Sequence, residues 1–307
     1  MSRNKIKLLT VIGARPQFMK ASMLSKKINL SKDFYEILVH TGQHYNKSMS
    51  STIISELFSR KPDYNLNSGG KDEINMTSYI IEKIKKLILK EKPNYVLVYG
   101  DTTTTLAASL SAKKLNIPLV HVEAGVRNYD LNMPEELNRV IVDRISDINF
   151  CATKQSLNNL KLEGYLKKTK KNFKVIFCGD LMFDCYNYSK NQIDNNHSLL
   201  NKYRDLIKKE YIYCTIHRQS NVDDKLSLTN IVKAVNQIHS KIPIIIPLHH
   251  RTRKRLKQFN LNLKCHVIES VSYFESLKLL KNCKFVITDS GGLVREAFFA
   301  KKKFIIT

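Results

Sequence analysis

The 307-residue sequence predicts an α/β protein with two Rossmann-like, doubly wound domains. Short apolar, β-branched runs alternate with longer amphipathic stretches, a pattern typical of βαβ units and parallel sheets. The alternation breaks once, in a polar, asparagine-rich stretch at about 181–210. Hydrophobic residues make up 43% of the chain, enough for sizeable cores. We therefore expect an N-terminal domain at 1–180 and a C-terminal domain at 185–307.

Six apolar runs of the first half are expected to be strands: KIKLLTVIG, YEILVHTG, YVLVYGD, IPLVHVEAG, INFCAT and KVIFCGD. Between them, MTSYIIEKIKKLILKEK and TLAASLSAKKLN are expected to be helices. PEELNRVIVDRI begins with a proline and two acidic residues, which suit the first turn of a helix. The stretch at 181–210 contains no strand signal and is expected to be a linker with an entry helix. In the second half the expected strands are YIYCTIH, IPIIIPLH, HVIES, KFVITDSGG and KKFIIT.

The chain is strongly basic, with 51 Lys and Arg residues against 27 Asp and Glu residues and a net charge of +24. This excess favours acidic partners such as nucleic acid, an anionic membrane face or phosphorylated small molecules. A compositional bias that leaves a solvated positive surface would produce the same excess. The basic runs RTRKRLK and KKTKKNFK lack interleaved aromatic residues, so we expect no specific nucleic-acid site.

Cysteine spacing and hydropathy indicate the compartment. None of the six cysteines forms a C-x-x-C pair, so neither a metal site nor a redox motif is expected. Several lie inside apolar runs, which favours a reduced, cytoplasmic protein. No run approaches the roughly 18 apolar residues of a membrane span, and the N-terminal run is expected to be a strand rather than a signal peptide.

In open α/β sheets, ligands bind outside the carboxyl ends of the strands, and charged residues follow several of the expected strands. Asp101 follows one of them, where it could simply cap the next helix. Glu123 ends a buried run, so its carboxylate needs a partner or a task, and Arg127 could be that partner. Lys20, on the helix after the first strand, is a further candidate.

In the second half, the strand ends carry His217 and His249, either of which could be an ordinary core histidine. TDSGGLVREAFFA places Gly291 and Gly292 at a strand-to-helix junction, where backbone N–H groups and a helix N-terminus can meet a phosphate. Two adjacent glycines can also make an ordinary turn. The fingerprint G-x-G-x-x-G is absent after every strand, which disfavours a dinucleotide redox enzyme. Together, these features predict a site for a nucleotide-activated sugar.

Several motifs, in order and spacing, resemble the non-hydrolysing UDP-N-acetylglucosamine 2-epimerases over nearly the whole chain. They are GARPQFMK, HTGQHY, KPDYNL, YGDTTTTLA, HVEAGVR, MPEELNRVIVDRISD, TIHRQSNVDD, HHRTRKR and ITDSGGLVREA. The resemblance implies the GT-B arrangement of two Rossmann-like domains and a homodimer. It also implies interconversion of UDP-GlcNAc and UDP-ManNAc without a nicotinamide or other cofactor, feeding surface polysaccharide synthesis.

The resemblance also implies roles for individual residues. It implies acid–base roles for three carboxylates and a position near the leaving diphosphate for one histidine, namely Asp101, Glu123, Glu135 and His217. It implies that Arg15 and Lys20, in the first loop and its helix, contact the phosphates. Ser290, Gly291 and Gly292 match the diphosphate loop, and Glu296 matches the residue that binds the ribose hydroxyls. Gln43 and His44 match a segment that binds a second UDP-GlcNAc as activator in bacterial members.

The sequence departs from the family pattern at Ser220, Arg144, His250 and Val294, where glutamate, histidine, proline and glutamine are usual. These departures leave the exact sugar open. A UDP-2,3-diacetamido uronic acid 2-epimerase and a hydrolysing variant are alternatives. The sequence ends at KKKFIIT, where the family continues, so the resemblance implies an incomplete second domain and reduced stability or activity. An inactive, truncated basic binding module is the alternative outside enzymes.

Overall fold

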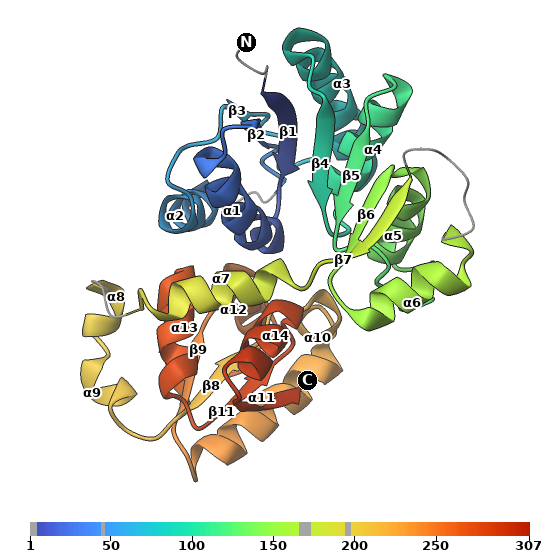
Figure 1. Ribbon diagram of the computed structural model, residues 1–307. Helices are drawn as coiled ribbons and strands as arrows, with labels where there is room; N and C mark the ends of the chain where they lie inside the picture. Colours follow the sequence, from blue (N-terminus) through green and yellow to red (C-terminus); the bar gives the residue numbers. More distant parts are fainter. Residues whose placement is uncertain (1–4, 44–46, 166–172, 194–197) are drawn as a thin grey trace. The chain divides into compact units, whose positions relative to one another are not determined.

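The structure, a computed structural model, describes residues 5–43, 47–165, 173–193 and 198–307. It divides into two compact units, Met1–Cys185 and Tyr186–Thr307. Within the described residues, the first unit contains a seven-stranded sheet and the second a five-stranded sheet, with helices packed against each (Figure 1). Neighbouring strands pair in parallel throughout. The predicted α/β class with two doubly wound sheets is confirmed.

The first sheet has the strand order β3-β2-β1-β4-β5-β6-β7. Its strands are β1 (Ile6–Ile12), β2 (Phe34–His40), β3 (Tyr64–Asn65), β4 (Tyr95–Tyr99), β5 (Leu119–Val122), β6 (Ile148–Cys151) and β7 (Lys174–Phe177). All but β3 coincide with the apolar runs that predicted strands, and β2 begins one residue before its run. Because β1 pairs with both β2 and β4, the strand order reverses between β1 and β4, and ligands of such sheets bind at that reversal.

The helices of the first unit are α1 (Arg15–Leu30), α2 (Lys47–Leu57), α3 (Glu73–Glu91), α4 (Thr103–Lys114), α5 (Pro134–Ile145), α6 (Lys154–Leu162) and α7 (Leu181–Lys190), the last of which crosses the boundary between units. Apolar side chains of α3, α4 and α5 share one core with β1, β2, β4 and β5. Figure 1 shows α1 and α2 together on the other side of the sheet. The sheet is therefore covered on both faces, which explains its continuous apolar runs.

The second sheet has the order β10-β9-β8-β11-β12 and reverses between β8 and β11. Its strands are β8 (Ile212–Thr215), β9 (Ile244–Pro247), β10 (His266–Ile268), β11 (Phe285–Thr288) and β12 (Lys303–Ile306). Its helices are α8 (Ser198–Asn201), α9 (Arg204–Ile207), α10 (Gln219–Val222), α11 (Lys225–His239), α12 (His250–Gln258), α13 (Tyr273–Asn282) and α14 (Gly291–Phe299). The asparagine-rich stretch is helical wherever it has regular structure among the described residues.

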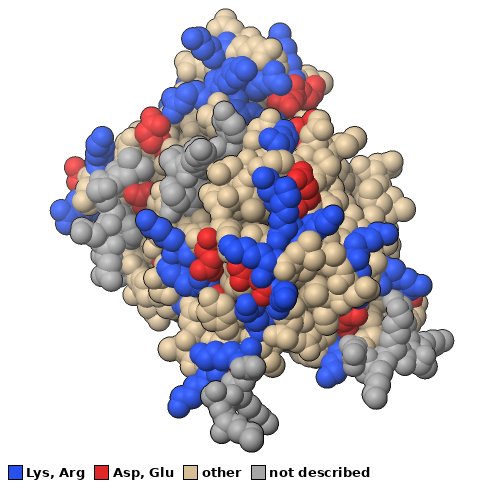
Figure 2. All heavy atoms as spheres, turned by 90° about the horizontal axis from the view of Figure 1, so that it is seen from above, with Lys and Arg blue, Asp and Glu red and all other residues tan. Residues whose placement is uncertain are grey.

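The surface reflects the basic composition. On the face seen in Figure 2, Lys and Arg side chains lie in several groups, with Asp and Glu side chains among them. This face therefore does not present one uninterrupted basic stripe of the kind that tracks a nucleic-acid backbone. No helix in the described part of the chain is long and apolar enough to cross a membrane.

Candidate active site

The loops that follow β1 and β4 are fastened together by Gln17 on α1. Its side-chain oxygen accepts a hydrogen bond from the backbone N–H of Gly13 at 2.7 Å. Its side-chain nitrogen donates to the carbonyl of Tyr99 at 2.7 Å and to the hydroxyl of Thr102 at 3.0 Å. Because Gln17 is buried, these bonds fix the two loops at the reversal of the strand order, where a ligand is expected.

Glu123 and Lys20 form a buried ion pair beside these loops. Glu123 follows β5 and is 8% exposed, Lys20 on α1 is 4% exposed, and Lys20 Nζ contacts Glu123 Oε2. The backbone of Glu123 has φ +74°, a left-handed conformation that is unfavourable for glutamate. Such strain is concentrated at functional sites, where the surrounding structure maintains it. The partner of Glu123 is thus Lys20, not Arg127 as the sequence suggested.

Asp101 lies after β4 and is paired with Arg139 of α5. Arg139 donates to Asp101 Oδ2 from Nε at 2.9 Å, and its Nη2 lies 2.7 Å from the same oxygen. Burial would lower the pKa of Arg139, but the Asp101 and Glu136 carboxylates raise it above its usual value. Thr102, not Asp101, caps α4 by accepting from the backbone of Thr105. The Asp101 carboxylate is therefore not used as a helix cap.

The acidic pair at the start of α5 is divided between surface and interior. Glu135 lies exposed in the first turn. Glu136 is 1% exposed and accepts from Arg139 at 2.6 Å and from the backbone N–H groups of Asn128 and Tyr129. Glu136 thus ties the loop after β5 to α5, a task that the sequence did not reveal, whereas Glu135 is the one accessible to a ligand.

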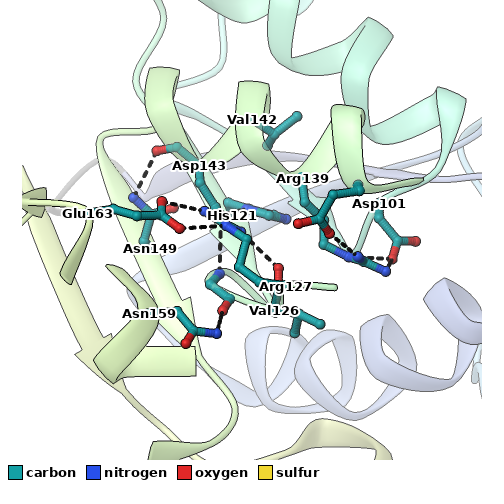
Figure 3. A network of polar contacts seen from close by, with 12 residues as sticks. Asp101, His121, Val126, Arg127, Arg139, Val142, Asp143, Asn149, Asn159 and Glu163 are labelled. Atoms are coloured by element: carbon teal, nitrogen blue, oxygen red, sulfur yellow. Dashed lines mark hydrogen bonds and ion pairs between the residues drawn. The ribbon is translucent and has the colours of Figure 1, made fainter. Parts of the chain in front are cut away.

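A second network of polar contacts joins His121, Asp143 and Arg127 (Figure 3). His121 Nδ1 lies 2.7 Å from Asp143 Oδ1, and its Nε2 lies 2.7 Å from the carbonyl oxygen of Gly100. Arg127 donates to Asp143 Oδ2 at 2.7 Å. It also donates two hydrogen bonds to the Glu163 carboxylate, at 2.8 and 2.9 Å. Burial raises the pKa of Asp143, but the bonds and charges of His121 and Arg127 outweigh it and hold that pKa below its usual value. Sequence reasoning missed this network, although a histidine inside a buried strand was an available signal.

In the second unit, Asp289 at the end of β11 holds the loop that follows β8. Its Oδ2 accepts from the backbone N–H of His217 at 2.8 Å and of Arg218 at 2.7 Å. The His217 ring nitrogen Nδ1 lies 3.3 Å from Asp289 Oδ1, and the His217 side chain is 44% exposed. Asp289 thus fixes the base of an accessible histidine at the β8/β11 reversal.

The sequence SGG forms the start of α14. Ser290 caps the helix and accepts from the backbone of Leu293, and Gly291 and Gly292 occupy the first turn. A Cβ added at Gly291 would meet no described atom within 4 Å, so packing does not explain the glycine. Glu296 follows one turn later and is buried. An exposed helix start without side chains is a suitable place for a phosphate.

The remaining predicted residues have mixed outcomes. Arg15 is the half-buried first residue of α1. Gln43 accepts from the backbone N–H and the hydroxyl of Thr104, at 3.2 and 2.7 Å, which attaches it to the start of α4. His44 lies outside the described residues. His249 caps α12, accepting from Arg251, so it has a structural task. Within the described chain, no cluster of three His, Cys, Asp or Glu residues could hold a metal ion.

Comparison with known proteins shows what this arrangement belongs to. The family model described as UDP-N-acetylglucosamine 2-epimerase matches residues 26–307. The chain belongs to the UDP-N-acetylglucosamine 2-epimerase family. The resemblance noted in the motifs is thereby confirmed, and so is the assignment to an isomerase.

Two curated relatives illustrate the range within this family. A Pseudomonas aeruginosa UDP-2,3-diacetamido-2,3-dideoxy-D-glucuronate 2-epimerase is 43% identical, over 97% of this chain and 82% of that protein. A UDP-N-acetylglucosamine 2-epimerase of Methanocaldococcus jannaschii is 39% identical, over 96% of this chain and 82% of that protein.

Solved structures agree with this assignment. The Methanocaldococcus jannaschii UDP-GlcNAc 2-epimerase in complex with UDP-GlcNAc and UDP has a TM-score of 0.87 and 38% identity, and the match covers 98% of this chain and 83% of that one. The Neisseria meningitidis UDP-GlcNAc 2-epimerase bound to UDP-GlcNAc has a TM-score of 0.84 and 28% identity, with 98% of this chain and 82% of that chain covered. The GT-B fold type is confirmed.

Proposed function

We propose that the chain interconverts UDP-N-acetylglucosamine and UDP-N-acetylmannosamine by inverting carbon 2 of the sugar. The observation that carries this proposal is the pair of carboxylates, Asp101 and Glu123, at neighbouring strand ends beside the β1/β4 reversal. The name of the matched family supports the substrate.

The chemistry explains why carboxylates are needed. The hydrogen on carbon 2 is not next to a carbonyl, so it is a very weak acid. It becomes removable as the C1–O bond to UDP breaks, the oxygen keeps the electron pair and positive charge grows on the ring. A carboxylate takes the C2 proton, leaving 2-acetamidoglucal and UDP. Re-addition of UDP at C1, with protonation of C2 on the opposite face, gives the epimer.

We assign the proton transfers to Asp101, Glu123 and Glu135, without dividing the acid and base steps among them. Arg139 pairs with the Asp101 carboxylate, and Lys20 pairs with that of Glu123. Both carboxylates therefore have fixed positions before substrate binds. Glu135, which is exposed, remains accessible to the sugar.

We assign the diphosphate to Ser290, Gly291 and Gly292 at the start of α14, with His217 supplying a donor or a proton to the leaving group. Glu296, in the next turn of α14, is proposed to bind the ribose hydroxyls. Arg15, the first residue of α1, and Lys20 are proposed to contact the phosphates, as the resemblance implies; the ammonium of Lys20 also contacts Glu123.

The test is incubation of the purified chain with UDP-GlcNAc in heavy water, followed by proton NMR. We expect UDP-ManNAc to appear and deuterium to enter carbon 2 of both sugars. Folded protein that yields neither the epimer nor deuterated sugar would refute the proposal. Release of free ManNAc and UDP would indicate a hydrolysing enzyme instead.

A second substrate is favoured by the 43% identity to the Pseudomonas aeruginosa UDP-2,3-diacetamido-2,3-dideoxy-D-glucuronate 2-epimerase. The same elimination and re-addition would invert carbon 2 of that sugar. Measuring kcat/KM for both UDP-sugars in parallel decides between them, because they differ at carbons 3 and 6 and a site built for polar substituents rejects a sugar that lacks them many-fold.

From the resemblance, we further infer a homodimer that acts in the cytoplasm and supplies surface polysaccharide synthesis. Analytical ultracentrifugation tests the dimer. Gln43, attached to the start of α4, is proposed to contribute to an activator site, together with His44. If so, a trace of UDP-GlcNAc will accelerate turnover of UDP-ManNAc in the native chain more than in the Gln43→Ala variant.

A further inference from the structure

The His121 ring lies between two hydrogen-bond acceptors. Nδ1 lies 2.7 Å from a carboxylate oxygen of Asp143, and Nε2 lies 2.7 Å from the carbonyl oxygen of Gly100. A neutral imidazole has one N–H and one lone pair, so it can donate to only one of these acceptors. The doubly protonated ring donates to both. Since His121 and Asp143 are fully buried, a contact left without a hydrogen would be costly.

The charges of the network point to the same protonation state. Asp143 and Glu163 are two carboxylates, and Arg127 supplies one cation to both of them. A protonated His121 supplies the second cation and makes the four groups neutral as a set. Glu163 is exposed to solvent, so the pairing matters most at the fully buried Asp143, which lies 2.7 Å from both His121 and Arg127.

Cys151 and Tyr165 are two further titratable groups near Asp143. Burial raises the pKa of Cys151 to about 12 and that of Tyr165 to about 12, so both are neutral at physiological pH. Glu123, on the same strand-end loop, has its own cation in Lys20.

The network joins the two loops that carry the proposed acid–base groups. Gly100 has a left-handed φ of +63° and directly precedes Asp101. Asp143 accepts from the backbone N–H of Gly125 at 3.0 Å, two residues after Glu123. His121 therefore connects the turn of one carboxylate with the loop of the other.

We propose that His121 is doubly protonated and acts as a positioning residue that fixes the Gly100–Asp101 turn relative to the Glu123–Gly125 loop. This inference rests on the proposed epimerase function, since it is for that chemistry that the distance between the two carboxylates matters. His121 itself does not touch the substrate.

The first experiment is ¹⁵N NMR of the full chain labelled in histidine, near neutral pH. We expect both ring nitrogens of His121 to carry a proton. A signal from an unprotonated ring nitrogen of His121 would overturn the proposal. This measurement depends neither on activity nor on a variant that folds.

The second experiment compares the variant His121→Gln with Val142→Ala. Glutamine cannot span both acceptors. Val142 is the neighbour of Asp143 on α5 and is fully buried in the core, so its truncation weakens the same helix without touching the ring contacts. We expect kcat of His121→Gln to fall by about 100-fold, as for a displaced catalytic group, with KM nearly unchanged. Val142→Ala should retain kcat. Equal kcat values in the two variants would overturn the proposal.

Amide hydrogen exchange separates this inference from the proposed function. If the native chain turns over neither UDP-sugar, the proposed function fails, and exchange at Asp101 and Gly125 then tests the positioning. Faster exchange at both amides in His121→Gln than in Val142→Ala supports the proposal, and equal exchange rules it out.

Discussion

At the scale of single residues, the two carboxylates at neighbouring strand ends, Glu123 and Asp101, each contact a cation. Lys20 serves Glu123, and Arg139 serves Asp101. The left-handed backbone of Glu123 adds strain that the ion pair helps to maintain.

Replacing Glu123 by glutamine removes one proton acceptor but keeps the side-chain shape. We expect C2 deuterium exchange to fall by about 10²–10⁴-fold, the usual contribution of a general acid or base, while UDP binding persists. NMR measures the exchange and calorimetry the binding. Glu82→Gln, at an exposed pair with Lys86, is the control and should keep full exchange. Undiminished exchange in Glu123→Gln would contradict the assignment.

His217 is expected to depend on Asp289. In the native chain, the two carboxylate oxygens of Asp289 contact two backbone N–H groups and the His217 ring nitrogen. The variant Asp289→Asn keeps only one of these oxygens, so it cannot make all of these contacts. We expect kcat to fall by about 10- to 100-fold. Asp223→Asn, which breaks a pair with Arg255 in the same unit, should leave kcat unchanged. Equal kcat values in the two variants would argue against this role.

Asp143 makes stability depend on acid pH. Its pKa in the folded state lies below that in the unfolded chain, which is about 3.9. Its contribution is therefore complete above that value and is lost as the pH falls through the folded pKa. We expect Asp143→Asn to cost about 3–5 kcal/mol near neutral pH, as when one partner of a buried ion pair is removed. Urea unfolding between about pH 7 and 3 should show this difference shrink below about pH 4. A constant difference would show that Asp143 acts through packing alone.

At the scale of elements, the strand-to-helix junctions of the two units use glycine for opposite reasons. A Cβ at Gly13 would lie 2.2 Å from the Thr104 hydroxyl and 2.3 Å from that of Thr41, which are hydrogen-bonded to each other at 2.7 Å. Packing therefore requires Gly13, whereas the space before Gly291 is open.

The two alanine variants should differ accordingly. We expect Gly13→Ala to lose about 1–3 kcal/mol of stability through overpacking. Gly291→Ala should keep its melting temperature and bind UDP more weakly, because the added methyl group approaches the proposed phosphate position. Calorimetry and UDP titration of both variants check this. If the Gly291→Ala variant bound UDP with native affinity, the diphosphate would not bind at the start of α14.

The elements also show what the sequence could predict. The apolar runs located the strands, because burial on both faces of a parallel sheet leaves a local pattern. β3, with two residues, has no such pattern and was missed. Lys20 and Glu123 were each singled out, but their pairing was not, since 103 residues separate them and only the folded sheet brings them together. Asp143 was missed because its partners, His121 and Arg127, lie 22 and 16 residues away and leave no local pattern. Glu136 binds residues nearby in the chain and His121 lies inside a buried strand, so a signal was available for both.

At the scale of the whole molecule, the net charge of +24 acts through its field. On the face in Figure 2 the basic groups are interspersed with acidic ones. We expect binding to random DNA at low salt to disappear near 0.15 M salt, where the screening length is about 8 Å, while UDP binding persists. Fluorescence anisotropy measures both. DNA binding that survives at this salt concentration would favour a nucleic-acid role.

The interior position of β1 in the first sheet has a consequence for biosynthesis. Leu9 of β1 pairs with Val96 of β4. During translation, β1 therefore cannot pair on this edge until β4 has left the ribosomal exit tunnel. Until then the nascent polypeptide carries an apolar strand with one edge unpaired, which is a template for aggregation. Production of this protein should therefore depend on translation rate and on chaperones that shield that edge.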